Sequence, residues 1–327
     1  MMRTALTIAV AVLLALPLGT LNAWSSQYPC FHASAAPAVD GDASDPCWSA
    51  TPLATGFSIL GNGFTDAKQT AFRLCWDDAA LYVLVVCEEP DVARLKTDVR
   101  DGGEAWLNDG VEVFVQPASG GQVYQLGVTA AAARSAGEGA PDWRQVEAAA
   151  ATGQASYTLE IAIPHGVVRA EPRVGVSWHG AICRNIWTTN SGGDKFTSWP
   201  ALQRRFLEPE HFATIDFRGA APSEQAVAAM TLERNRGYRE HLVAQLRGLT
   251  EQAPHYLPGL EQARESEELG GRARSLLYRW YRLARMQAAS ERFSIQQLRE
   301  TVQSAEALQA ASYDVKYAHL IDGLFPD

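Results

Sequence analysis

Short runs of alternating apolar and polar residues, separated by Gly, Asp, Asn and Pro, fill the chain between residues 39 and 218. The clearest run is 157–163, where every odd-numbered residue is aromatic or aliphatic and falls on the same face of a strand. The expected strands are 70–76, 81–88, 110–116, 123–129, 156–163, 174–185 and 213–217. No long helical pattern lies between them, which favours a mainly β fold: an antiparallel β-sandwich of the jelly-roll or immunoglobulin-like kind.

The composition changes after residues 219–222 (GAAP), where Glu, Arg, Gln, Ala and Leu become dominant. These are strong helix formers, and Ser223 is suited to cap the first helix. The expected helices are 223–251, 259–288 and 294–311. The chain is therefore expected to divide into a β-sandwich domain at 24–220 and an α-helical C-terminal region at 221–327.

One stretch of this helical region combines apolar residues at helical spacing with a high density of arginine. The apolar residues run from Leu276 to Ala284 and predict the core of a helical bundle. The arginines around them predict either a solvated face or a surface for a membrane or a partner protein.

The first 23 residues have the pattern of a secretory signal peptide. Arg3 supplies a positive start, residues 6–18 form an apolar stretch too short to span a bilayer, and Ala23 ends a small-residue cleavage site. We therefore expect a secreted or periplasmic protein whose mature chain has no membrane span. The formal charge of −9 argues against nucleic acid as a partner, since phosphates require a basic surface.

Five cysteines in an exported chain allow at most two disulfides. Cys30 and Cys47 are the best pair, because they flank a loop-like stretch whose closure would contribute about 3 kcal/mol in the chain-entropy model. Cys75 and Cys87 lie on the two arms of an expected hairpin and point to opposite sides of the sheet. The second bridge is then expected between Cys87 and Cys183, unless all three strand cysteines are small buried apolar side chains.

Several short motifs follow one another in order along the expected sandwich. They are Val39-Asp40-Gly41 with Asp45 and Trp48, the strand start Ala80 to Val83 (ALYV), the segment Trp106 to Phe114 (WLNDGVEVF), and the late segments Ser198-Trp199 and Phe206 to Ala213 (FLEPEHFA). In this order they resemble a family 9 carbohydrate-binding module, of the wider DOMON-like superfamily, over residues 37–218. The central W-x-x-D-x-x-E pattern is the most specific part, because an aromatic, an aspartate and a glutamate at a strand entrance serve no obvious packing purpose.

The resemblance implies a site that holds a terminal sugar between two aromatic side chains. The apolar faces of a sugar ring stack on aromatic rings, and its hydroxyl groups need charged or amide partners. Trp106 matches the first aromatic position, and Phe206 matches the second, which is often Trp in the family. The full set of expected carbohydrate-binding residues is Trp106, Asp109, Glu112, Gln125, Trp199 and Phe206.

These residues also have purely structural interpretations. Trp106 can be a partly buried aromatic, Glu112 can accept hydrogen bonds from buried backbone N–H groups, and Trp199 and Phe206 can close the end of the sandwich. One position departs from the family pattern, because Gly127 stands where relatives can carry an arginine that bonds sugar hydroxyls.

Calcium is the one cofactor expected. Asp40, Asp42 and Asp45 are spaced so that their oxygens could converge on Ca²⁺, and the resemblance implies calcium because family members often bind it. A solvated turn is the alternative, since no full ligand loop with a terminal glutamate is present. Haem is not expected, because residues 39–218 contain no methionine to act with histidine as an axial ligand.

The expected function is that of an exported, non-catalytic carbohydrate-binding module that captures the end of a glycan beside a partner enzyme. The sequence has no zinc-protease, nucleophile-elbow, P-loop or dinucleotide motif, so any link to activity would be accessory to the hydrolysis of glycosidic bonds. Two alternatives stay open. One is an interaction protein that works through its C-terminal helices after losing sugar binding, and the other is a haem-carrying redox protein of the DOMON type.

Overall fold

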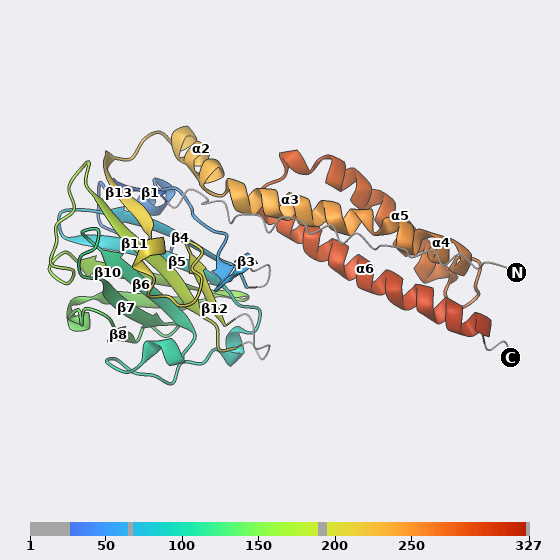
Figure 1. The fold of residues 1–327 in the computed structure, drawn as a ribbon, viewed down its shortest axis with the longest axis horizontal. Helices are drawn as coiled ribbons and strands as arrows, with labels where there is room; N and C mark the ends of the chain where they lie inside the picture. Colours follow the sequence, from blue (N-terminus) through green and yellow to red (C-terminus); the bar gives the residue numbers. More distant parts are fainter. Residues whose placement is uncertain (1–26, 65–67, 189–194, 325–327) are drawn as a thin grey trace, which may run out of the picture.

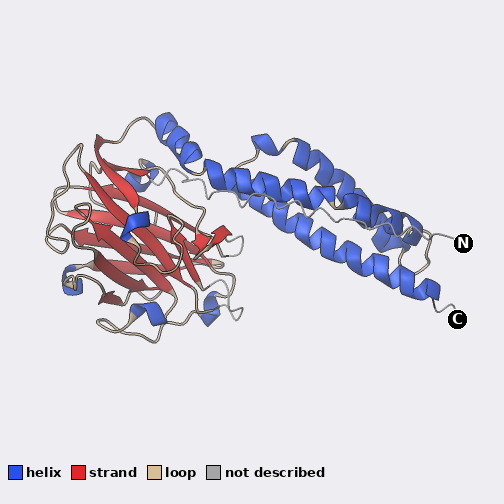
Figure 2. Ribbon diagram, in the orientation of Figure 1, coloured by secondary structure: helices blue, strands red, loops and turns tan. Residues whose placement is uncertain are grey.

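The computed structural model describes residues 27–64, 68–188 and 195–324. A body built of β-strands and a long helical bundle lie end to end (Figure 1). Figure 2 shows that nearly all the strands belong to the first part and all the long helices to the second. The expected signal peptide, residues 1–23, lies outside the described residues.

The strands of the described residues form one 13-stranded mixed sheet that folds over into two packed layers. The strands of the first layer are β4 (Thr70–Trp76), β5 (Ala80–Glu88), β9 (Glu147–Thr152) and β10 (Ser156–Pro164). Those of the second are β2 (Ser58–Ile59), β3 (Asn62–Phe64), β6 (Gly110–Gln116), β7 (Tyr124–Thr129), β8 (Arg134–Ala136), β11 (Ser177–Asn185) and β12 (Phe196–Trp199). The two layers are joined through β1 (Gln27–His32) and β13 (Ala213–Ala220).

The expectation of a purely antiparallel sheet needs a correction at β1. This strand pairs in parallel with β13 and, at residues 31–32, with β4. The other ladders between the described strands are antiparallel. The sheet is mixed because one strand near the start of the described chain enters between the two layers and hydrogen bonds to both.

The sandwich core lies between the layers and follows the period-2 alternation of the strands. Val83 and Leu159 enter it from the first layer, and Val113 and Trp178 enter it from the second. Trp178 also packs edge-on against Phe217, with 4.7 Å between ring centres. The residues that alternate with these apolar side chains on β6, β7 and β11 therefore face away from the core, and that outer face carries the site described below.

The helical region is divided differently from the expectation. Its helices are α2 (Glu224–Arg234), α3 (Arg236–Glu251), α4 (Ala253–Ala263), α5 (Gly270–Ala288) and α6 (Ile295–Leu324), with a short 3-10 turn η5 (Ser290–Arg292) before α6. Ser223 caps α2 by accepting a hydrogen bond from the N–H of Ala226. The expected helix end at residue 251 is observed, with Pro254 in the first turn of α4. The helix expected at 259–288 is divided, because Pro258 lies inside α4 and the chain turns at 264–269 before α5. Among the described helices, none is long and apolar enough to cross a membrane.

The bundle is fastened to the sandwich at the junction of α2 and α3. Asn235, which is 2 % exposed, accepts a hydrogen bond from the N–H of Thr55 and donates one to the carbonyl oxygen of Leu53, both at 2.9 Å. A second contact joins Arg299 of α6 to the carboxylate of Glu88 at the end of β5. The helix expected at 223–251 is interrupted at Asn235, the residue that makes the first of these contacts.

Candidate functional site

A cluster of polar side chains lies on the outer face of the second layer. Glu112 of β6, Gln125 of β7 and Asn185 of β11 all alternate with core residues, so the pleat turns them to the same side of the sheet. One carboxylate oxygen of Glu112 accepts a hydrogen bond from Asn185 Nδ2 at 2.7 Å, and the other accepts one from Gln125 Nε2. The three side chains thus form one hydrogen-bonded unit, which we call the carboxylate–amide cluster.

The cluster is nearly closed to solvent. Glu112 is 4 % exposed and Asn185 is 1 % exposed, whereas Gln125 is half-buried. Burial raises the pKa of the Glu112 carboxyl above its ordinary value, although the two amide donors act in the opposite direction. The side-chain oxygen of Asn185 has no hydrogen-bond donor among the described residues, which leaves an unused acceptor inside the cluster.

Two tryptophans lie beside each other near the cluster. Trp106 belongs to the 3-10 turn η2 (Ala105–Leu107), and its carbonyl oxygen accepts a hydrogen bond from the indole N–H of Trp187 at 2.9 Å. Both indoles are half-buried. The ammonium groups of Lys96 and Lys195 lie 4.7 and 4.8 Å from the ring centre of Trp187. Sequence reasoning missed Trp187, and its place two residues after Asn185 at the end of a long strand was the signal that could have found it.

Asp109 has a different role from the one expected. It is fully buried, and it accepts hydrogen bonds from the N–H groups of Lys96 and Trp187, both at 2.8 Å, and of Thr188 at 3.3 Å. These bonds fix the chain after β11 to the chain before β6. Asp109 therefore positions Trp187 and lies behind the exposed part of the site.

The two other expected aromatic residues, Trp199 and Phe206, lie on opposite faces of the second layer. Trp199 points into the sandwich core, where its ring centre is 4.9 Å from that of Phe72, so it closes the core and does not line the outer face. Phe206 does lie over the outer face. It packs edge-on against Phe196 in a small apolar cluster that includes Cys183, the cross-strand neighbour of Glu112.

Gly127 has no room for a side chain. It lies opposite Glu112 on β7, and a Cβ atom there would be 2.8 Å from Ser135 Oγ and 2.9 Å from the Cβ of Ala105. The space that the family's arginine would need is therefore filled by η2. This close approach brings Trp106, the next residue after Ala105, down onto the sheet.

The three aspartates expected to bind calcium accept hydrogen bonds within their own loop. Asp40 accepts from the N–H of Asp42 at 2.8 Å, Asp42 accepts from that of Ser44 at 3.1 Å, and Asp45 accepts from that of Ala38 at 3.0 Å. Over residues 27–64, 68–188 and 195–324, no group of three His, Cys, Asp or Glu side chains is arranged to hold a metal ion. Calcium binding stays a prediction that the geometry does not support.

The expected disulfides are not formed, because strand alternation places the thiols apart. Cys30 points into the sandwich core, whereas Cys47, which belongs to the short helix α1 (Pro46–Ser49), lies in a separate apolar cluster with Cys75. Cys87 faces the core and Cys183 faces the outer side of the other layer. All five thiols are free and buried, so the expectation of Cys30–Cys47 and Cys87–Cys183 bridges is corrected.

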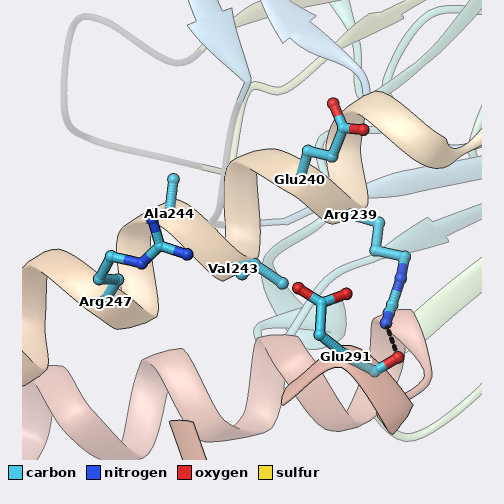
Figure 3. A pocket seen from close by; sticks show the side chains of 6 residues that line it. All are labelled: Arg239, Glu240, Val243, Ala244, Arg247 and Glu291. Atoms are coloured by element: carbon cyan, nitrogen blue, oxygen red, sulfur yellow. Dashed lines mark hydrogen bonds between the residues drawn. The ribbon is translucent and has the colours of Figure 1, made fainter. Parts of the chain in front are cut away.

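Two depressions lie away from the cluster. One, of about 450 Å³, is lined mostly by alanines of the sandwich, including residues 130–132, together with Thr97 and Thr152. The other, of about 220 Å³, lies on the bundle (Figure 3) and is lined by Arg239, Glu240, Val243, Ala244, Arg247 and Glu291. Arg239 donates there to the carbonyl oxygens of Ser290, Glu291 and Phe293, so its guanidinium is used to hold η5 against α3.

Comparisons with known proteins give similar solved structures and one family match. Among solved structures, the chain is similar to a family 9 carbohydrate-binding module from Caldicellulosiruptor kristjanssonii in complex with glucose, with 18 % identity and a TM-score of 0.47 over 60 % of this chain and 98 % of that one. A structure of such a module from the same organism in complex with cellotriose shows 18 % identity and a TM-score of 0.45 over 61 % of this chain and 96 % of that one. No curated protein matches the chain. The family model described as carbohydrate family 9 binding domain-like matches residues 39–217, which is more than half of the 327 residues, and the chain belongs to that family.

Proposed function

We propose that this chain is a carbohydrate-binding protein and that the carboxylate–amide cluster, beside Trp106 and Trp187, is its sugar site. The observation that carries the proposal is the hydrogen-bonded carboxylate–amide cluster on the outer face of the sheet, with the half-buried Gln125 at its surface and two half-buried indoles nearby. Carboxylate and amide groups are suitable hydrogen-bond partners for sugar hydroxyls.

The chemistry of the cluster suits a polyhydroxy ligand. Each hydroxyl group both donates and accepts, so it can exchange hydrogen bonds with the half-buried amide of Gln125. The two half-buried indoles offer flat surfaces for the apolar faces of the ring. Membership of the family and the sugar complexes of the similar modules support the same proposal.

The cluster favours binding over catalysis. The hydrogen-bond partners of Glu112 are two side-chain amides, which neither accept nor release protons near neutral pH. The nearby carboxylate of Asp109 is fully buried and holds three backbone N–H groups. A hydrolytic site needs a pair of carboxyl groups that flank the bond to be cleaved, with one acting as acid. We therefore propose a non-catalytic module.

Titration calorimetry of the full chain against mono- and oligosaccharides tests this proposal. Removing an aromatic stacking surface should cost about 1 kcal/mol or more of binding free energy, so Trp106→Ala and Trp187→Ala should each weaken sugar binding by roughly tenfold. Phe206→Ala should weaken it less. Tyr313→Ala on α6 is the control, because it removes an exposed aromatic far along the chain from the cluster. If a sugar binds wild type and the two tryptophan variants equally, the site lies elsewhere. If no sugar binds, the interaction-protein alternative takes over.

We further propose that the protein is exported and captures glycan ends beside a partner enzyme. The support is the signal-peptide pattern of residues 1–23, with cleavage after Ala23. Mass spectrometry of the N-terminal peptide from periplasmic extract or culture medium should then give a chain that starts at Trp24. Recovery of the chain with residues 1–23 intact in the cytosolic fraction would contradict export.

A further inference from the structure

The helix α5 carries a stripe of exposed arginines and tyrosines along the outside of the bundle. Arg274, Tyr278, Tyr281, Arg282 and Arg285 are all exposed. Each lies three or four residues from another member of the set, so they share one broad face of the helix. We call these five residues the α5 stripe. At 1.5 Å per residue the stripe is about 16 Å long. Figure 1 shows α5 running along one border of the bundle.

The opposite face of α5 is used to build the bundle. Its buried residues are Ala273, Leu276, Leu277, Trp280 and Leu283. Trp280 stacks on Tyr256 of α4 and donates its indole N–H to Ser312 of α6. Within the α5 stripe, Arg274 donates a hydrogen bond to the carbonyl oxygen of Arg264 at 2.8 Å, whereas Tyr278 and Tyr281 leave 69 % and 58 % of their surfaces in solvent.

The stripe is locally positive in a chain of formal charge −9. The 19 residues of α5 include five arginines and no aspartate or glutamate. Among the described residues, no carboxylate lies within ion-pair distance of Arg274, Arg282 or Arg285. A surface with unpaired guanidinium groups is complementary to an anionic partner.

The residue types narrow the class of anion. Arginine presents a planar fork that matches a carboxylate, and a tyrosine ring matches the apolar face of a sugar. A lipid surface fits less well, because the apolar face of α5 is already buried in the bundle and none is left to insert. Nucleic acid carries a phosphate every 3.4 Å of each strand, a density that the overall negative charge opposes.

We propose that the α5 stripe binds an acidic polysaccharide, with arginines on the carboxylates of uronic acid residues and tyrosines on the rings. This surface is separate from the carboxylate–amide cluster of the sandwich, and it does not depend on the function proposed for that cluster. The chain then holds two glycan-binding surfaces of different charge preference, one on each domain.

The test uses the full chain and two probes with the same sugar backbone, an oligogalacturonate and its uncharged methyl ester. Arg282→Gln/Arg285→Gln should weaken oligogalacturonate binding roughly five- to thirtyfold, the upper part of the range for two exposed ion pairs. Arg236→Gln/Arg247→Gln removes two exposed arginines of α3 and is the matched control, with an expected change of about twofold or less. Binding of the wild type to oligogalacturonate should weaken with salt and should exceed binding to the methyl ester.

Tyr278→Ala/Tyr281→Ala should also weaken oligogalacturonate binding. Adding Trp106→Ala should not change the fold-loss of oligogalacturonate affinity that Arg282→Gln/Arg285→Gln causes. Equal weakening by the two arginine pairs would mean a general charge effect and would overturn the proposal. So would the absence of oligogalacturonate binding, or tighter binding of phosphatidylglycerol vesicles or a single-stranded oligonucleotide through the same arginines. If the wild type binds oligogalacturonate but no neutral sugar, the result counts against the sandwich site and not against the α5 stripe.

Discussion

Filling the position of Gly127 should destabilise the fold and disturb the sugar site together. A Cβ there would lie 2.8 Å from Ser135 Oγ and 2.9 Å from the Cβ of Ala105, whereas non-bonded carbon atoms pack at about 3.5–4.0 Å. The backbone cannot easily move aside, because β7 is hydrogen bonded to β6 on one edge and to β8 on the other. Overpacking of this kind costs about 1–3 kcal/mol, so Gly127→Ala should lower the free energy of unfolding by that amount.

A double-mutant cycle identifies the cause. Ala105→Gly removes the methyl group, and the nearest remaining atom of residue 105 is then its Cα, 4.0 Å from the new Cβ. Gly127→Ala/Ala105→Gly should therefore be more stable than the sum of the single changes predicts, by about 1 kcal/mol. Urea denaturation followed by tryptophan fluorescence measures each free energy. Gly166→Ala is the control, because no atom lies within 4 Å of its Cβ position.

Two results would refute this reasoning: Gly127→Ala as stable as wild type, or a double mutant whose loss is the plain sum of the single losses. The same clash predicts that Gly127→Arg does not restore the arginine of the family pattern. Any side chain at 127 pushes Ala105 outward and moves Trp106 with it, so calorimetry should show weaker sugar binding for both substitutions.

Three further predictions follow from buried polar groups. Burial raises the pKa of the Glu112 carboxyl, so the stability that its protonated form provides is lost as pH rises from its ordinary pKa, about 4.3, through the higher pKa of the folded state. Urea denaturation at a series of pH values should therefore show the free energy of unfolding of Glu112→Gln rising relative to that of the wild type across this range, and a constant difference would contradict the assignment. Asn235→Ala leaves the N–H of Thr55 and the carbonyl of Leu53 unpaired and should lower the free energy of unfolding by about 1–3 kcal/mol, measured by urea denaturation. Gln252→Ala at the exposed α3–α4 junction should lower it little, and equal losses would count against the role of Asn235 in holding the bundle to the sandwich. Burial raises the pKa of Cys30, Cys87 and Cys183, so a thiol reagent should react slowly with the native chain and find five thiols after denaturation without reductant, whereas three would reveal a bridge.

Strong local patterns were enough to predict most of the sandwich. The expected strands at 70–76 and 110–116 coincide with β4 and β6, and that at 156–163 lies within β10. In contrast, β9 was missed because its sequence, EAAAAT, is alanine-rich and has low strand propensity, and it is a strand only through pairing with β10. β1 was missed because its parallel partners come from residues 75–76 and 214–220, which no local pattern connects to residues 27–32.

The site was predicted only in part, because sequence patterns reveal neighbours along one segment and not contacts between distant strands. Trp106 and Glu112 lie on one short motif, so their proximity is local and readable. Asn185 and Trp187 reach them only through the pairing of β11 with β6, a contact between segments more than 70 residues apart. Trp199 has the residue type of a sugar platform, and only the facing of β12 shows that its ring lies in the core.

Nuclear magnetic resonance titration of the nitrogen-labelled chain with mono- and oligosaccharides tests the central claim most directly. The side-chain amide signals of Asn185 and Gln125 and the indole N–H signals of Trp106 and Trp187 report on the groups proposed to touch the ligand. Binding at the carboxylate–amide cluster predicts saturable shifts of these four signals, with those of the bundle unchanged. Saturable shifts confined to other residues, with these four signals unmoved, would contradict it.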